Sequence, residues 1–105
     1  MRPVSLPDLS RMSEPVRRQI RETYSALALK IADPRTPTAD LGHAYGEMGK
    51  LFLAAHQRLD AAESCFLNAQ ALAPNEARWP YYLGHVYRGR SDSGRAAASF
   101  DRSLQ

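Results

Sequence analysis

Three histidines and one cysteine are the side chains best suited to metal or nucleophilic chemistry in this chain of 105 residues. His43, His56 and His85 lack the HExxH spacing, or any other spacing that would place metal ligands on one helix face. Cys65 stands directly before Phe66 in an apolar helical pattern, which is typical of a buried and inert thiol. A lone cysteine also excludes an internal disulfide and a CxxC metal knuckle. We therefore expect no catalytic residue, metal site, cofactor, small-molecule substrate or enzymatic activity.

Cationic and aromatic side chains recur at helical spacing around Gly49 and Gly84, and this pattern favours binding over catalysis. Positions six and three before each glycine, and one, four and five after it, fall on one helical face. Around the first glycine this face holds His43, Gly46, Lys50, Leu53 and Ala54. Around the second it holds Arg78, Tyr81, His85, Arg88 and Gly89.

Both faces together predict a peptide-binding site made of His43, Lys50, Leu53, Arg78, Tyr81, His85 and Arg88. They carry three permanent cations and no carboxylate, which suits an acidic peptide or a chain-terminal carboxylate. Lys50 and Arg88 would pair with the carboxylate while Tyr81 packs against an apolar side chain. Space for a peptide backbone or an inserted helix is expected at the small residues of these faces, Gly46, Ala54 and Gly89. The alternative is that the cations belong to an ordinary solvated surface.

The elements that must position these faces begin with an arm and a helix. Residues 1–12 contain Pro3 and Pro7 and are predicted to be extended, lying in a groove of this or a neighbouring molecule or forming a free tail. A helix is predicted over 14–33, with Ser13 as its N-cap, because apolar residues recur there at helical spacing: Val16, Ile20, Tyr24, Leu27 and Ile31.

Two further pairs of helices are predicted, at about 37–75 and 77–105. The first pair opens at Thr36-Pro37 and breaks near residues 57–59, where Asp60 is expected to cap its second helix. The second pair starts near Trp79-Pro80, turns at residues 89–94, and resumes with Asp92 or Ser93 as the cap. No segment alternates as a strand does, so the sequence predicts an all-α fold with one domain over 13–105.

The two pairs of helices repeat one another. A shift of 34 superimposes Ala62 on Ala96 and Phe66 on Phe100, and a shift of 35 superimposes Gly49 on Gly84 and Phe52 on Tyr87. The difference implies an insertion around residues 56–59. Small residues at these positions would let two helices approach closely while the aromatic rings fill the remaining space.

At these positions the chain resembles the tetratricopeptide repeat (TPR) family. The second unit carries Leu83-Gly84, Tyr87, Ala96 and Phe100, and the first carries Met48-Gly49, Phe52, Ala62, Phe66, Ala69 and Pro74. The chain departs from the family pattern at Trp79, which stands one place early, with Pro80 in its slot. The resemblance implies an α-α superhelix with a capping helix over 14–33. It also implies that the concave face, at the positions named above, binds a peptide or partner helix.

Charge and chain ends leave other functions open. The net charge of +3 and pI of about 9.4 allow weak nucleic-acid binding through the Arg88-Gly89-Arg90 turn and Arg95. The last predicted helix carries Phe100 and Leu104, which would leave an apolar end for a homo-oligomer contact or for further repeats of a longer array. An alternative function is therefore that of an oligomerisation or spacer segment of a longer TPR protein. The resemblance also suggests a bacterial protein, cytoplasmic or periplasmic. The first twelve residues show no apolar signal-peptide region.

Overall fold

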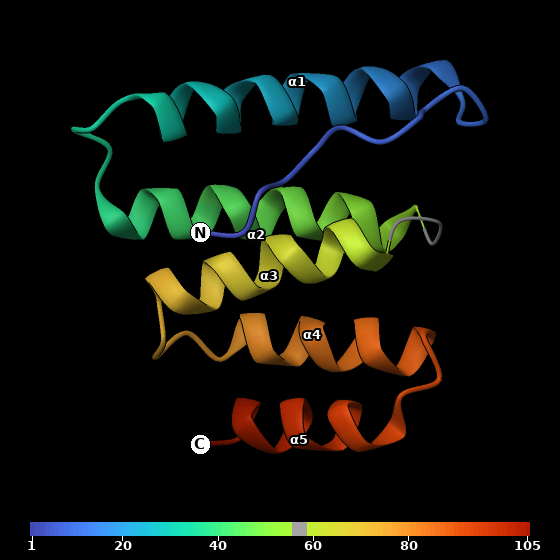
Figure 1. Cartoon of the computed structure of the whole chain (residues 1–105), viewed down its shortest axis with the longest axis vertical. Coiled ribbons are helices and arrows are strands. Elements are labelled where there is room, and N and C mark those ends of the chain that lie inside the picture. Colours follow the sequence, from blue (N-terminus) through green and yellow to red (C-terminus); the bar gives the residue numbers. More distant parts are fainter. Residues whose placement is uncertain (56–58) are drawn as a thin grey trace.

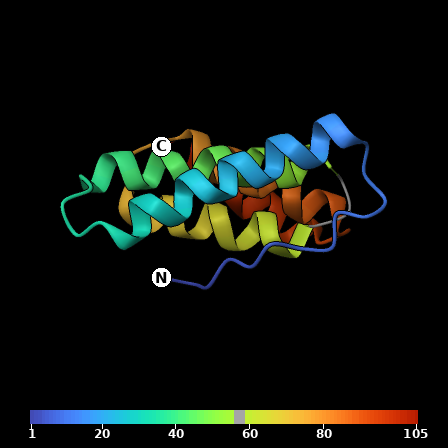
Figure 2. The ribbon, with the colours of Figure 1, turned by 90° about the horizontal axis from the view of Figure 1, so that it is seen from above.

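The structure, a computed structural model, describes residues 1–55 and 59–105. Its five helices are α1 (Glu14–Ala32), α2 (Thr38–Ala54), α3 (Leu59–Leu72), α4 (Arg78–Gly89) and α5 (Ser93–Ser103). The described residues contain no strand, so the predicted all-α fold is confirmed. Successive helices run antiparallel and lie side by side in chain order (Figure 1). The chain as a whole forms a layer whose extents are 36 × 34 × 19 Å, with α2 and α3 on opposite sides of it (Figure 2).

The helix ends follow the local sequence. Pro15 lies in the first turn of α1, where its missing N–H removes no hydrogen bond, and Ser13 occupies the N-cap position without a side-chain bond. Asp92 caps α5, because its Oδ1 accepts the backbone N–H of Arg95 at 3.1 Å. Helix α3 begins at Leu59, which places Asp60 in its first turn rather than at the N-cap. The predicted insertion around 56–59 falls mainly on residues outside those described.

The closest helix contacts occur where a glycine faces a phenylalanine. A Cβ atom on Gly49 of α2 would lie 2.8 Å from Cε1 of Phe66 on α3. A Cβ atom on Gly84 of α4 would overlap the ring of Phe100 on α5. The absence of a side chain therefore lets each aromatic ring lie directly on the backbone of the neighbouring helix. The predicted close approach at both glycines is confirmed.

Trp79 links the two pairs of helices. Its indole is buried and lies on Gly46 of α2, where a Cβ atom would overlap the ring. The ring also stacks on Phe66, with 6.3 Å between ring centroids. The expectation that Gly46 leaves space for a peptide backbone is therefore wrong, because Trp79 of the same chain fills that space. This contact fixes α4 against α2 and α3.

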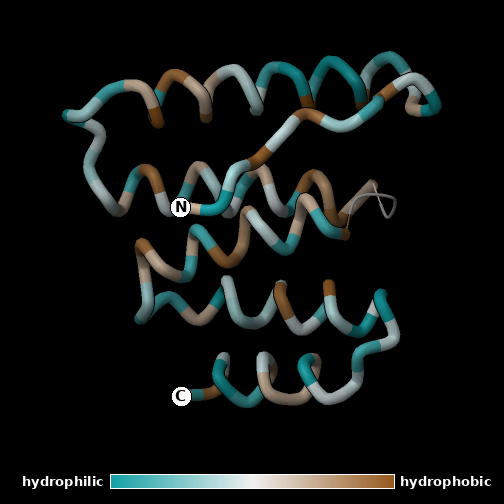
Figure 3. The backbone as a smooth tube through the Cα atoms, viewed as in Figure 1, coloured by the Kyte–Doolittle hydropathy of each residue, from teal (hydrophilic) through white to brown (hydrophobic). Residues whose placement is uncertain are grey.

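Helix α1 is covered only at its centre. Ile20 and Leu27 are buried, whereas Val16 and Ile31 at the ends of the predicted stripe are exposed. The first half of α1 is largely hydrophilic, as the tube in Figure 3 shows. Within the described residues, α1 packs on α2 but makes no direct helix–helix contact with α3. The middle of the stripe is therefore the part of α1 that holds it on the layer.

The N-terminal arm has no helix, as predicted, and it is not a free tail. It crosses in front of α2 in Figure 1 and lies at the opposite side of the layer from α2 in Figure 2. Leu9 is only 4% exposed and belongs to the buried core. The arm therefore lies against α1 and α3, which both form hydrogen bonds with its backbone.

The other end of the layer is open. Leu104 follows α5 and is 84% exposed, while Phe100 is half-buried under α4. In the described part of the chain, no helix combines the length and apolar character needed to cross a membrane.

Candidate functional site

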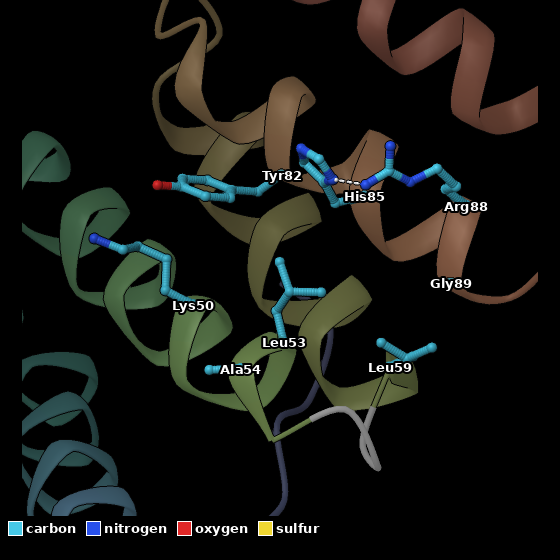
Figure 4. A pocket seen from close by; sticks show the side chains of 8 residues that line it. All are labelled: Lys50, Leu53, Ala54, Leu59, Tyr82, His85, Arg88 and Gly89. Atoms are coloured by element: carbon cyan, nitrogen blue, oxygen red, sulfur yellow. Dashed lines mark hydrogen bonds between the residues drawn. The ribbon is translucent and has the colours of Figure 1, made fainter.

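A pocket of about 550 Å³ opens between α2 and α4 and is closed at one end by the start of α3. Figure 4 shows side chains from α2 and α4 facing one another across it. The pocket includes four of the seven predicted site residues: Lys50, Leu53, His85 and Arg88. The remaining lining residues are Ala54, Leu59, Tyr82 and Gly89.

The glycine contacts explain why these four side chains meet. Gly49 and Gly84 each face the second helix of their own pair. Lys50 and His85 directly follow these glycines, and Leu53 and Arg88 lie one turn further along the same helices. Packing of α4 against α2 then brings the two faces together. The local register of two helices therefore builds both walls of the pocket.

His85 and Arg88 form a hydrogen-bonded pair on the α4 wall. Nη2 of Arg88 donates to Nδ1 of His85 at 2.8 Å (Figure 4). The imidazole lies edge-on to two rings, with its centroid 4.7 Å from Tyr81 and 5.2 Å from Phe100. Burial lowers the pKa of His85, and the nearby charge of Arg88 lowers it further. Because a guanidinium can only donate, Nδ1 is the acceptor, which places the proton of the neutral imidazole on Nε2.

Lys50 on the α2 wall has an acidic neighbour that the predicted faces did not include. Its Nζ lies 3.4 Å from Oε1 of Glu47 and 5.9 Å from the centre of the Tyr82 ring. His43 approaches the same oxygen, with Nε2 at 3.8 Å. Glu47 therefore balances much of the positive charge expected on this wall. Arg88, by contrast, forms no ion pair with a carboxylate within 1–55 and 59–105.

Three predicted residues lie outside the pocket. His43 is nearly two helical turns before Lys50 and lines a separate depression against α1. Arg78, in the first turn of α4, pairs with Glu76 at 3.1 Å and stacks on Trp79. Tyr81 is 48% exposed and meets Phe100 edge-on, with 6.0 Å between centroids, so it covers α5.

Sequence reasoning missed two lining residues, Tyr82 and Leu59. Tyr82 stacks on Phe66 with 5.3 Å between centroids and an interplanar angle of 12°. Its place three residues before His85 is a helical spacing that could have suggested it. Leu59 reaches the pocket from α3, where its Cδ1 would lie 3.2 Å from a Cβ atom on Gly89. No local pattern links Leu59 to Gly89, because only the packing of α3 against α4 brings them together.

The remaining chemistry-bearing groups do not converge. Cys65 is fully buried, and burial raises its pKa to about 12, so the thiolate is scarce at neutral pH. The described residues contain no group of three or more His, Cys, Asp or Glu side chains arranged to hold a metal ion. Arg90 and Arg95 are engaged by Glu63 at 2.8 Å and Asp92 at 3.5 Å, which weakens the phosphate-binding interpretation.

Comparison with protein-family models, with curated proteins and with solved structures finds no match to this chain. The fold and the pocket therefore carry the functional inference, and the resemblance to TPR repeats stays a prediction.

Proposed function

We propose that this chain is a TPR-like helical-repeat module that binds a peptide or a partner helix in the pocket between α2 and α4. One contact, made in both pairs of helices, supports the repeat. Gly49 and Gly84, which correspond under the sequence shift, each lie against the phenylalanine that corresponds in the following helix. Phe66 and Phe100 thus make equivalent contacts in two successive helix pairs. A stack of such pairs brings their first helices together, and α2 and α4 are in contact here.

The ligand that fits best carries an apolar side chain next to one carboxylate. Leu53, Leu59 and Tyr82 supply an apolar wall that would be covered by such a side chain. Arg88 supplies planar, bidentate donors at the edge of that wall. Because Glu47 already neutralises Lys50, the lysine would contribute less than Arg88 to carboxylate binding.

The observation that carries the proposal is the placement of Arg88 beside apolar surface with a neutral histidine as its hydrogen-bond partner. A guanidinium next to apolar surface gains more from a carboxylate than one that is fully hydrated. Because Arg88 is exposed, its ion pair with a carboxylate is screened by water and contributes up to about 1 kcal/mol, and reversal of its charge adds repulsion to the loss of that attraction.

A pair of matched peptide probes tests this function. Fluorescent peptides of identical apolar sequence would carry either one central glutamate or one central lysine, and binding would be measured by anisotropy. We expect the glutamate peptide to bind, and Arg88→Glu to weaken that binding more than tenfold. The control Arg102→Glu makes the same charge change on α5, away from this pocket, and should change affinity less than twofold.

Equal binding of the two peptides, or equal losses in the two variants, would overturn the proposal. The salt dependence separates peptide binding from nucleic-acid binding. A single carboxylate contact gives a shallow decline of affinity with salt, whereas several phosphate contacts give a steep one.

A further inference from the structure

The N-terminal arm is held by its backbone. The side-chain amide of Asn68 on α3 forms two hydrogen bonds with one arm residue: the N–H of Arg2 donates to Oδ1 at 2.9 Å, and Nδ2 donates to the carbonyl of Arg2 at 2.8 Å. Further along the arm, the hydroxyl of Tyr24 on α1 donates to the carbonyl of Val4 at 3.3 Å. The arm is therefore bound by polar groups from two helices that do not pack on one another.

Asn68 is the one buried polar side chain of the core in the described part of the chain, and it is 2% exposed. Burial of an amide without partners is costly, so a segment that covers Asn68 must supply its hydrogen bonds, as the backbone of Arg2 does. A side-chain amide that pairs with both the N–H and the carbonyl of one residue reproduces the pairing of neighbouring strands. Such pairing selects an extended backbone and is indifferent to the side chain that the paired residue carries.

Apolar contacts complete the groove. Leu9 is buried, and Val4 and Met12 pack partly against the same core. The arm and the groups that hold it on α1 and α3 do not line the pocket between α2 and α4, and Figure 2 shows the arm on the opposite side of the layer from α2. The groove has the elements of an extended-peptide site. Asn68 binds the peptide backbone at one end (the backbone clamp), and apolar core residues surround Leu9 at the other (the apolar seat).

We propose that the groove between α1 and α3 is a second, extended-peptide binding site. Its resident ligand is the chain's own arm, and the arm of a second copy binds there when the resident arm is released. The second copy is the occupant because its arm carries the same backbone groups and the same leucine as the segment that the groove already holds. Exchange of identical segments in this way is a low-cost route to a dimer.

The test uses the full chain with a weakened arm and a peptide that corresponds to residues 1–12, labelled at its C-terminus. Leu9→Asp places a charge in the apolar seat and should release the resident arm while leaving Asn68 intact. We expect the peptide to bind this variant at least tenfold more tightly than it binds the unmodified chain. In the unmodified chain, the resident arm competes with the peptide at an effective concentration in the millimolar range.

Two modified peptides test the backbone clamp. Arg2→Pro removes the N–H that Asn68 accepts, whereas Arg2→Ala removes the same charge and keeps the N–H. The proline peptide should bind about fivefold more weakly than the alanine peptide, which is the effect of one net hydrogen bond. Asn68→Ala in the Leu9→Asp chain should weaken binding about thirtyfold, because it removes both hydrogen bonds to Arg2. Arg88→Glu in that chain should leave it unchanged, which separates this site from the pocket.

Three results would overturn the proposal: no binding to the Leu9→Asp chain, equal binding to that chain and the unmodified one, or equal binding of the proline and alanine peptides. If circular dichroism shows that Leu9→Asp has lost its helices, Val4→Asp weakens the arm at a less buried position and is judged by the same three results.

Discussion

The contact between Gly84 and Phe100 gives the sharpest test of how the helices pack. Gly84→Ala adds a single Cβ atom, which would overlap the Phe100 ring. Overpacking of this kind costs about 1–3 kcal/mol in the free energy of unfolding. Alanine also stabilises a helix by about 1 kcal/mol relative to glycine, so the cost of the clash has to be separated from this gain in helix stability.

Gly94→Ala provides the matched control. Gly94 is exposed in the first turn of α5, and a Cβ atom there would lie 3.9 Å from Oδ1 of Asp92, an ordinary contact. This variant should be neutral or stabilised by up to about 1 kcal/mol. The difference between the two variants therefore measures the overlap, and we expect it to be about 2 kcal/mol. For a domain of this size that corresponds to about 8–16 °C in melting temperature.

Thermal unfolding followed by circular dichroism at 222 nm measures both variants. Phe100→Leu combined with Gly84→Ala removes the ring that the new methyl group meets, so the two changes together should cost less than the sum of their separate effects. If Gly84→Ala melts at or above the temperature of Gly94→Ala, the close approach of α4 and α5 described above is incorrect.

Other measurements examine the remaining groups. Lys50→Glu combined with Arg88→Glu should weaken binding of the acidic peptide well over tenfold with unchanged helicity, while Lys50→Glu alone should cost less because Glu47 already balances the lysine. Cys65 should resist alkylation by iodoacetamide at pH 8 in the folded chain and react once the chain is unfolded in urea, because burial raises its pKa to about 12. The pKa of His85 lies below its ordinary value of 6.5, so the unfolded chain binds a proton first as the pH falls. Stability should therefore decrease as the pH falls from about 6.5 through the folded pKa, and His85→Gln should remove this part of the decrease.

Much of the fold could be predicted from local patterns. Apolar spacing, prolines near the helix starts and the Asp92 cap act over a few residues, and they located five helices to within a few positions. The close helix contacts were also predictable, since a glycine followed 17 or 16 residues later by a phenylalanine indicates where two antiparallel helices meet.

The binding site was predictable only in part. Helical spacing correctly grouped Lys50 with Leu53 and His85 with Arg88, because residues on one helix face keep their relative positions in any fold. It did not separate Tyr81 from Tyr82. These neighbours differ by about 100° around α4, and the position of α5 decides which of them covers Phe100.

The amino-acid sequence by itself determined the helices and their order, because helix formation depends on interactions between near neighbours. It also indicated the small and aromatic residues at which the helices touch, because the two pairs of helices repeat the same pattern. Tertiary structure decided which side chains share a pocket, that Trp79 fills the space at Gly46, and that the arm lies against Asn68. Those features join residues up to 66 positions apart. They depend on the angle and depth at which whole helices pack, which no short stretch of sequence specifies.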